Sequence, residues 1–334
     1  MKQVIISDPT LRDGNHAAGH QISLKQIEAY CRAIDTAGVH TVEVGHGNGL
    51  GASSLQLGES PCSDAQILET ARSTLKRSKL GVLCIPGFAT IEKDLKPAIA
   101  AGVDVVRIGC HCTEADLTQR HISFVRDAGK TVYGVLMMIH MVSKEELTDE
   151  ARKMESYGAE AIILMDSAGS SLPKDVTEKI TCLLDNLSIP VGFHAHNNLG
   201  VGIANSVAAL EAGASILDAS SRGYGAGAGN AQLEILVAVL EKMGYQTGID
   251  LYKCLDAADL AEKEIISAIP TVKSVSIVSG LSGIFSGFLK PVLRVAAEFK
   301  VDPRDIFFEL GRRKVVAGQE DLIIEVAIDL ARRK

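Results

Sequence analysis

Near its N-terminus the chain reads Asp8-Pro9-Thr10-Leu11-Arg12-Asp13-Gly14-Asn15-His16, shortly after the apolar run Val4-Ile5-Ile6. The apolar run is short and β-branched, and a proline follows it closely, so it predicts a buried strand that stops at Pro9. An arginine, an aspartate and a histidine then occur within five residues. Such a cluster is costly to bury unless its charges are paired or hold a metal ion. For this stretch taken alone, a solvated turn with an Arg12–Asp13 pair is the simpler alternative.

The rest of the first 220 residues alternates between apolar runs and helical patterns. Near-continuous apolar runs are typical of parallel strands that are buried on both faces. Eight such strand–helix units indicate a (β/α)8 TIM barrel, in the α/β class. A doubly wound open sheet is the alternative, but no Gly-x-Gly-x-x-Gly follows the first strand. The predicted strands are 4–6, 41–44, 80–85, 105–109, 131–138, 161–165, 191–194 and 216–219.

From about Gly248 the rhythm changes, and helical patterns continue without clear strands. The predicted helices are 250–267, 281–299, 303–312 and 319–333. We therefore expect a barrel domain over residues 1–247 and an all-helical C-terminal appendage over residues 248–334.

Composition limits the partners of this chain of 334 residues. Its net charge of −7 argues against nucleic acid or an anionic membrane as the main partner. No apolar run reaches membrane-spanning length. Seven scattered cysteines, an odd number, are typical of the reduced thiols of a cytoplasmic protein.

The polar residues of the predicted barrel gather where its strands end, the position of catalytic groups in TIM barrels. Arg12, Asp13 and His16 follow the first strand, while His194 and His196 end the seventh. Residues i and i+2 of a strand point to the same side, so the two imidazoles can face one point. With Asp13 they form a two-histidine, one-carboxylate set, which suits a divalent transition metal with open positions. Two hydrogen-bonded core histidines are the alternative.

A glycine-rich loop, residues 223–229, follows the eighth predicted strand. It resembles a phosphate-binding loop but lacks the lysine of one. We therefore expect close backbone packing there rather than phosphate binding.

Two motifs resemble the metallolyase barrels that include isopropylmalate synthase, hydroxymethylglutaryl-CoA lyase and 4-hydroxy-2-oxovalerate aldolase. They are Asp8-x-Thr10-Leu11-Arg12-Asp13-Gly14 and His194-x-His196-Asn197-Asn198. The 4-hydroxy-2-oxovalerate aldolase family is the most similar, along almost the entire chain. Further stretches that carry this resemblance are 47–51, 111–116, 166–169, 225–230, 309–313 and 318–321. The last two lie in the helical appendage, outside the generic lyase core, and favour the aldolase branch.

The resemblance implies a class II pyruvate aldolase, which cleaves a 4-hydroxy-2-oxoacid to pyruvate and an aldehyde such as acetaldehyde. Asp13, His194 and His196 would hold Mn²⁺, with Mg²⁺ or Co²⁺ as alternatives. The carboxylate and 2-oxo oxygen of the substrate would take the open positions, so that the substrate lies against His194.

Arg12 and His16 are the catalytic residues that the resemblance implies. Arg12 would contact the 2-oxo oxygen, where the charge of a metal-bound pyruvate enolate develops. His16 would act as general base on the 4-hydroxyl group. Ser167 would donate a hydrogen bond to the substrate carboxylate. A structural ion pair with Asp13 or Glu43 is the alternative for Arg12.

The sequence departs from the family at the mouth of the barrel. The family carries tyrosines in the segment that matches residues 280–288, whereas this chain has Leu281 and Phe285. Arg222 and Tyr224 replace small and apolar residues after the eighth strand. We therefore expect substrate contacts from Phe285, Tyr224 and Arg222, with a hydroxyl from Tyr224 and an altered aldehyde group that is anionic where it meets Arg222. A surface position for Arg222 is the alternative.

The C-terminal domain of the family docks an acylating aldehyde dehydrogenase, which implies this partner and a homodimer within a heterotetramer. The same segment can instead form only the homodimer. Two further functions stay open: a Claisen-type condensing enzyme like isopropylmalate synthase, and a non-catalytic scaffold subunit. Five intact polar residues at the strand ends argue against the scaffold.

Overall fold

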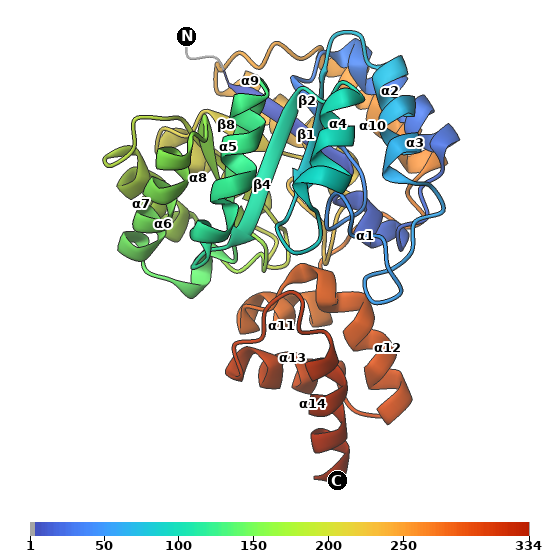
Figure 1. Cartoon of the computed structure of the whole chain (residues 1–334). Coiled ribbons are helices and arrows are strands. Elements are labelled where there is room, and N and C mark those ends of the chain that lie inside the picture. The colour runs from blue at the N-terminus through green and yellow to red at the C-terminus, as the bar shows by residue number, and fades with distance from the viewer. Residues whose placement is uncertain (1–3, 334) are drawn as a thin grey trace.

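The computed structural model describes residues 4–333, and within them eight parallel strands close into a barrel in sequence order (Figure 1). The predicted (β/α)8 barrel is therefore confirmed. Its strands are β1 (Ile5–Leu11), β2 (Thr41–Val44), β3 (Lys79–Cys84), β4 (Val105–His111), β5 (Thr131–Met137), β6 (Ala161–Asp166), β7 (Val191–Ala195) and β8 (Ile216–Asp218).

The first strand differs from its prediction, because β1 does not stop at Pro9. It pairs with β8 through Ile5 to Ser7 and with β2 through Ser7 and Asp8, and the register with β2 then shifts before Leu11. A proline has no N–H group to donate, and this irregularity accommodates it within the strand. The strand thus carries the chain farther toward the mouth of the barrel before Arg12 and Asp13.

Helices on the outside of the barrel follow the strands and cover them. They begin and end with local signals: Ser23 and Ser143 accept hydrogen bonds from the first turns of α2 and α6, and Gly38 and Gly158 end these helices with left-handed φ. The helices are α2 (Leu24–Ala37), α3 (Asp64–Thr74), α4 (Lys96–Ala100), α5 (Gln119–Asp127), α6 (Lys144–Tyr157), α7 (Pro173–Leu184), α8 (Gly202–Glu211) and α9 (Leu233–Lys242). Short helical turns are η1 (Ile91–Leu95), η2 (Ala115–Thr118), η3 (Ile139–Met141) and η4 (Ser221–Gly223).

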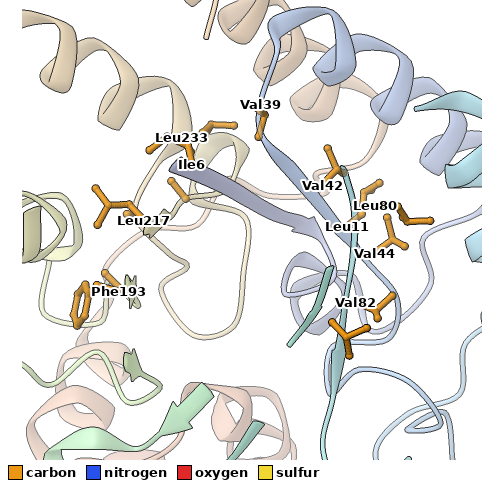
Figure 2. Packing of buried hydrophobic residues seen from close by; sticks show 14 of the residues in the cluster. Ile6, Leu11, Val39, Val42, Val44, Leu80, Val82, Phe193, Leu217 and Leu233 are labelled. Carbon is orange, nitrogen blue, oxygen red and sulfur yellow. The ribbon is translucent and has the colours of Figure 1, made fainter. Parts of the chain in front are cut away.

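The main hydrophobic core lies around the strands, and Figure 2 shows part of it, with Ile6, Val42 and Leu80 from neighbouring strands. Helix α10 (Leu251–Glu264) packs against α2, and its buried face belongs to this core. A second core consists of residues from 275 to 331. We therefore propose that the division between the two domains lies after α10, at residues 267–273, and that the barrel domain includes the first helix expected of the appendage.

The C-terminal domain is all-helical, as predicted, but its helices differ in detail. They are α11 (Ser274–Ser282), the turn η5 (Ser286–Phe288), α12 (Leu289–Phe299), α13 (Pro303–Arg312) and α14 (Asp321–Arg332). The helix expected at 281–299 begins only at Leu289, because Gly283 adopts a left-handed conformation and ends α11. The serine-rich α11 was not predicted, since serine and glycine are weak helix formers.

The C-terminal domain lies at one end of the barrel, below the short helix α1 (Gly14–Ala18) in Figure 1. Polar contacts join the two parts. The Ser286 amide donates to the Ser167 carbonyl oxygen at 2.9 Å, and Asn198 Nδ2 donates to Ser286 Oγ at 2.9 Å. Because Ser167 and Asn198 follow β6 and β7, this domain covers the carboxyl ends of the strands.

No helix in residues 4–333 is both long and apolar enough to cross a bilayer.

Leu80→Ala tests the barrel core, since Leu80 is fully buried in β3. We expect the free energy of unfolding to fall by about 2–5 kcal/mol, through lost burial and the cavity left behind. Urea denaturation followed by circular dichroism measures this change. Leu55→Ala is the matched control, because Leu55 is 90 % exposed. Equal losses in the two variants would contradict the packing described here.

Candidate active site

Three side chains from opposite ends of the barrel sequence meet at its mouth. Asp13 precedes α1, His194 lies in β7 and His196 follows that strand. One ligand atom of each residue lies within 4.8 Å of the others, and all three residues are buried. The expected convergence of two imidazoles and a carboxylate is therefore present in the structure.

The orientation of His194 is set by Asp218 at the end of β8. His194 Nδ1 lies 3.0 Å from Asp218 Oδ2. Burial alone would raise the pKa of Asp218, but Arg107 outweighs it and holds this pKa below its usual range. An ionised carboxylate only accepts hydrogen bonds, so Nδ1 carries the proton and Nε2 keeps its lone pair. Metal-binding histidines are commonly oriented in this way.

The free nitrogens of the two histidines test whether this site suits a metal ion. His194 Nε2 and His196 Nδ1 are buried and have no hydrogen-bond partner among the described residues. Burying an unpartnered polar atom costs about 1–3 kcal/mol. Burial also lowers the pKa of His196 to about 3, so its imidazole is neutral and able to coordinate. These donor atoms fit a divalent cation.

Asp13 is held by three groups from two segments, the neighbouring Arg12 and the loop after β8. Its Oδ1 accepts from Arg12 Nη1 at 2.8 Å, and its Oδ2 accepts from Asn230 Nδ2 at 2.8 Å and from the Ala226 amide at 3.2 Å. Burial favours the neutral acid, but His196 and Arg12 outweigh it and hold the pKa of Asp13 below its usual range. Asp13 is therefore a carboxylate, and three hydrogen bonds leave one of its roughly four lone-pair sites for a cation.

The glycine-rich loop after β8 packs closely against Asp13, as its sequence predicted. A Cβ atom at Gly225 would lie 2.3 Å from Asp13 Oδ2. The absence of a side chain lets the backbone amide of Ala226 reach the carboxylate.

A buried set of charges surrounds the three candidate ligands. Arg12 Nε donates to Glu43, Arg107 Nε lies 3.2 Å from Glu43 Oε2, and Arg107 Nη2 donates to Asp218 Oδ1 at 2.7 Å. With Asp13, the set contains two arginines and three carboxylates, which leaves a net charge of −1. This excess of negative charge beside the two imidazoles also suits a divalent cation, since buried charges are paired or coordinate metals.

Arg12 and His16 have the properties that their predicted roles require. Arg12 Nη2 is buried and has no hydrogen-bond partner among the described residues, so one donor of its guanidinium is free. Burial lowers the pKa of His16 to about 4, which outweighs the attraction of Asp13. At pH 7 this imidazole is neutral and able to accept a proton. Its ring rests against Gly47, where a Cβ atom would lie 2.7 Å from it.

His20 packs against His16, and His46 packs against His20; neither contact was predicted from the sequence. The His20 ring meets the His16 ring edge-on at 5.4 Å and stacks on His46 at 3.7 Å with an interplanar angle of 7°. His20 has a left-handed φ of 63°, which costs a non-glycine residue of order 1–3 kcal/mol. The spacing of four residues between His16 and His20, just after a strand, was the available signal.

Phe285 and Tyr224 lie near His16, whereas Ser167 lies at the end of β6. The Phe285 ring meets the His16 ring edge-on at 6.0 Å. Tyr224 lines a cavity together with His16, and its ring packs over Gly14. Ser167 Oγ accepts from the Met138 amide at 3.2 Å at the end of β6. Leu281, the other position where the family has tyrosine, is 64 % exposed on α11.

Arg222 is not brought to this site. Its guanidinium donates to Glu234 at 3.0 Å, to Glu262 at 2.8 Å and to Asp259. These carboxylates belong to α9 and α10, on the outside of the barrel. The expected contact between Arg222 and an anionic substrate group is therefore absent, because three carboxylates occupy the side chain.

Three residues that hold the candidate ligands in place were not predicted from the sequence: Arg107, Asp218 and Asn230. Arg107 and Asp218 each interrupt a run of apolar residues, Val105-Val106-Arg107-Ile108 and Ile216-Leu217-Asp218-Ala219. In both strands the available signal was a charged residue among buried apolar ones, because a buried charge requires a partner.

The fold and this site define a barrel of the HMGL-like class. Residues 3–261 match the HMGL-like family, and residues 270–332 match a DmpG-like communication domain. The carboxyl transferase domain of Rhizobium etli pyruvate carboxylase has the same fold, with a TM-score of 0.82 at 15 % identity over 100 % of this chain and 61 % of that one.

Within this class, the chain belongs to the 4-hydroxy-2-oxovalerate aldolase family. It is 63 % identical to the 4-hydroxy-2-oxovalerate aldolase of Spirochaeta aurantia over 99 % of this chain and 97 % of the relative. It is 59 % identical to that of Pectobacterium atrosepticum, again over 99 % and 97 %. The resemblance on which the sequence analysis relied is therefore confirmed.

Asp218→Asn tests the orientation of His194. We expect affinity for Mn²⁺ to fall about 10–100-fold, because an amide no longer fixes the proton on Nδ1. Calorimetric titration with Mn²⁺ measures this, with circular dichroism to verify folding, since Asp218 also pairs with Arg107. Asp127→Asn removes the same charge from an exposed pair with Arg126 and is the control. A folded Asp218→Asn protein with unchanged affinity would contradict this role.

Proposed function

We propose that this protein is a divalent-metal-dependent, class II pyruvate aldolase. It cleaves 4-hydroxy-2-oxovalerate, or a closely similar 4-hydroxy-2-oxoacid, to pyruvate and an aldehyde such as acetaldehyde. One observation carries this proposal: the candidate metal ligands Asp13, His194 and His196 lie beside a free guanidinium donor and a neutral imidazole. The names of the curated relatives support the same activity.

Asp13, His194 and His196 would hold the cation, for which we propose Mn²⁺, with Mg²⁺ or Co²⁺ as alternatives. When bound, such a cation polarises the 2-oxo group and binds the substrate carboxylate. Arg12 Nη2, which has no partner in the protein, would donate to the 2-oxo oxygen. A preorganised donor of this kind, placed where negative charge develops, stabilises the transition state.

His16 would accept the proton of the 4-hydroxyl group. The C3–C4 bond then breaks: the 4-oxygen becomes the aldehyde carbonyl oxygen, and the electron pair moves toward C3 and the 2-oxo oxygen. Protonation of C3 gives pyruvate. The low pKa of His16 keeps its imidazole neutral before the reaction, and its contact with His20 keeps the ring in place.

The aldehyde group would lie in the cavity that His16 and Tyr224 line, whose other residues are largely apolar. We propose contacts from Tyr224 and Phe285 to this part of the substrate and from Ser167 to its carboxylate. Arg222 is not available to recognise a charged aldehyde group, because its side chain is paired with three carboxylates elsewhere. A Claisen-type reaction and a scaffold role are not favoured by the relatives.

The match to a DmpG-like communication domain supports an interacting partner. We propose an acylating aldehyde dehydrogenase, which would consume the aldehyde, with this chain as a homodimer within a heterotetramer. A cytoplasmic location is proposed because all seven cysteines are free thiols.

A pyruvate-release assay with Mn²⁺ and 4-hydroxy-2-oxovalerate tests the proposed activity. We expect kcat to fall about 10²–10⁴-fold in His16→Ala, through loss of the general base. In Arg12→Lys it is expected to fall about 10²–10³-fold, through loss of the free Nη2 donor. His121→Ala is the matched control, since His121 lies on α5, outside the site. Pyruvate release that is absent from the wild type, or equal in the His16 variant, would contradict the proposal.

His20→Ala tests the support of His16. We expect kcat to fall about 10–100-fold with little change in Mn²⁺ affinity, because a small displacement of the base slows proton transfer while the ligands stay in place. His20→Phe should recover part of this loss, since a phenyl ring can make the same edge-on contact. Steady-state kinetics together with Mn²⁺ titration separate the effects. A loss of Mn²⁺ affinity equal to the loss of kcat would show that His20 supports the whole site instead.

A further inference from the structure

Two cavities open where the C-terminal domain meets the barrel, and His16 lines both. Their volumes are about 390 Å³ and 460 Å³. Gly287 and Lys290 also line both, so the segment before and at the start of α12 lies between them. In Figure 1 this helix lies on the side of the C-terminal domain that faces α1. A substrate that reaches His16 from solvent therefore passes the residues of this junction.

The edges of these cavities carry three cations, all from the C-terminal part of the chain. Lys273 lines the first cavity, Arg294 lines the second and Lys290 lines both. We call these three residues the cationic rim. Lys290 and Arg294 are four residues apart on α12 and so project from neighbouring turns of one face.

The cationic rim is not neutralised by the protein. Among residues 4–333, no carboxylate lies within 4.0 Å of the side-chain nitrogens of Lys273, Lys290 or Arg294. The two cavities have one acidic lining residue, Glu320, so their combined lining has an excess of positive charge. Most surface arginines elsewhere pair with a carboxylate, as Arg222 and Arg313 do.

This local charge contrasts with the whole chain, whose net charge of −7 repels an anion. A 4-hydroxy-2-oxoacid is an anion at neutral pH. A cleft edged with charges opposite to those of the substrate raises its local concentration and the rate of association, by about 10–10³-fold where the effect is strong. We propose that the cationic rim captures the carboxylate of the substrate at the cavity mouth, before the substrate reaches Arg12 and His16. This proposal rests on the proposed function.

Lys290 differs from the other two residues because it also joins the domains. Its Nζ donates to the Ala17 carbonyl oxygen at 2.5 Å, next to His16. Replacing Lys290 would disturb α1 as well as remove a charge. Lys273 and Arg294 are exposed and have no such contact, so they are the cleaner positions for a test.

The test compares wild type with the double variant Lys273→Gln/Arg294→Gln over a range of ionic strength. We expect the double variant to have a kcat/KM for 4-hydroxy-2-oxovalerate about 3–10-fold below that of wild type at low salt, a difference that disappears at high salt because ions screen the charges. In the direction of aldol addition, the KM for pyruvate should rise while the KM for neutral acetaldehyde stays constant. The charge-preserving variant Lys273→Arg/Arg294→Lys should behave like wild type.

Lys130→Gln is the matched control, because Lys130 precedes β5 at the opposite end of the barrel. An identical salt dependence of kcat/KM in wild type and the double variant would overturn the proposal. An equal rise in the KM for acetaldehyde in the double variant would also overturn it. The same holds if the double variant loses binding to a dehydrogenase partner while its KM for pyruvate is unchanged. If wild type releases no pyruvate, the proposed function fails by itself. Calorimetric titration of the Mn²⁺-loaded protein with pyruvate then decides the role of the rim: salt-sensitive binding that the double variant lacks supports it, and equal binding overturns it.

Discussion

The candidate site depends on one buried chain of interacting polar and charged side chains. The chain runs from Asp13 through Arg12, Glu43, Arg107 and Asp218 to His194. It connects one candidate metal ligand to another across strands β1, β2, β4, β8 and β7. Removal of one partner from such a buried set leaves an uncompensated charge and typically costs about 3–5 kcal/mol. The arrangement is possible because a closed parallel barrel brings side chains from five strands, distant in sequence, to one place.

The same charges prepare the site for chemistry before any substrate arrives. Arg12 uses its Nε and Nη1 within the protein and keeps Nη2 free. His194 is fixed because Asp218 occupies its Nδ1, while its Nε2 has no hydrogen-bond partner among the described residues. In each of these two residues, one part of the side chain is hydrogen-bonded within the protein. Another part stays available to the substrate or the cation. Sites held in this way do not need to reorganise as charge develops.

The C-terminal domain forms part of the mouth of the barrel. It contributes Phe285 next to His16, and its backbone is hydrogen-bonded to the end of β6. Its own hydrophobic core is separate from that of the barrel. Because the two cores are separate, neither domain depends on the other for its own hydrophobic packing. The junction between the two domains also carries the cationic rim.

How far the sequence leads can be judged from particular elements. The alternation of apolar runs with capped helices was sufficient to predict the barrel, because each strand and helix depends mainly on its own residues. The candidate metal ligands were also predictable, since Asp13, His194 and His196 lie at strand ends whose position the fold dictates. Strand β1 was predicted too short, because its passage through Pro9 depends on an irregular register with β2.

The sequence by itself therefore determined the class of fold, the ligand types and the family, all of which rest on local patterns and motifs. Only the tertiary structure decided which charges pair. Arg222 and Arg107 look alike in sequence as isolated arginines near strands, but Arg222 meets carboxylates outside the barrel and Arg107 is buried beneath the site. It likewise placed His20 against His16 and α10 against α2. Such contacts join residues that are far apart in the chain or depend on side-chain direction, so a local pattern can point to a residue but does not identify its partner.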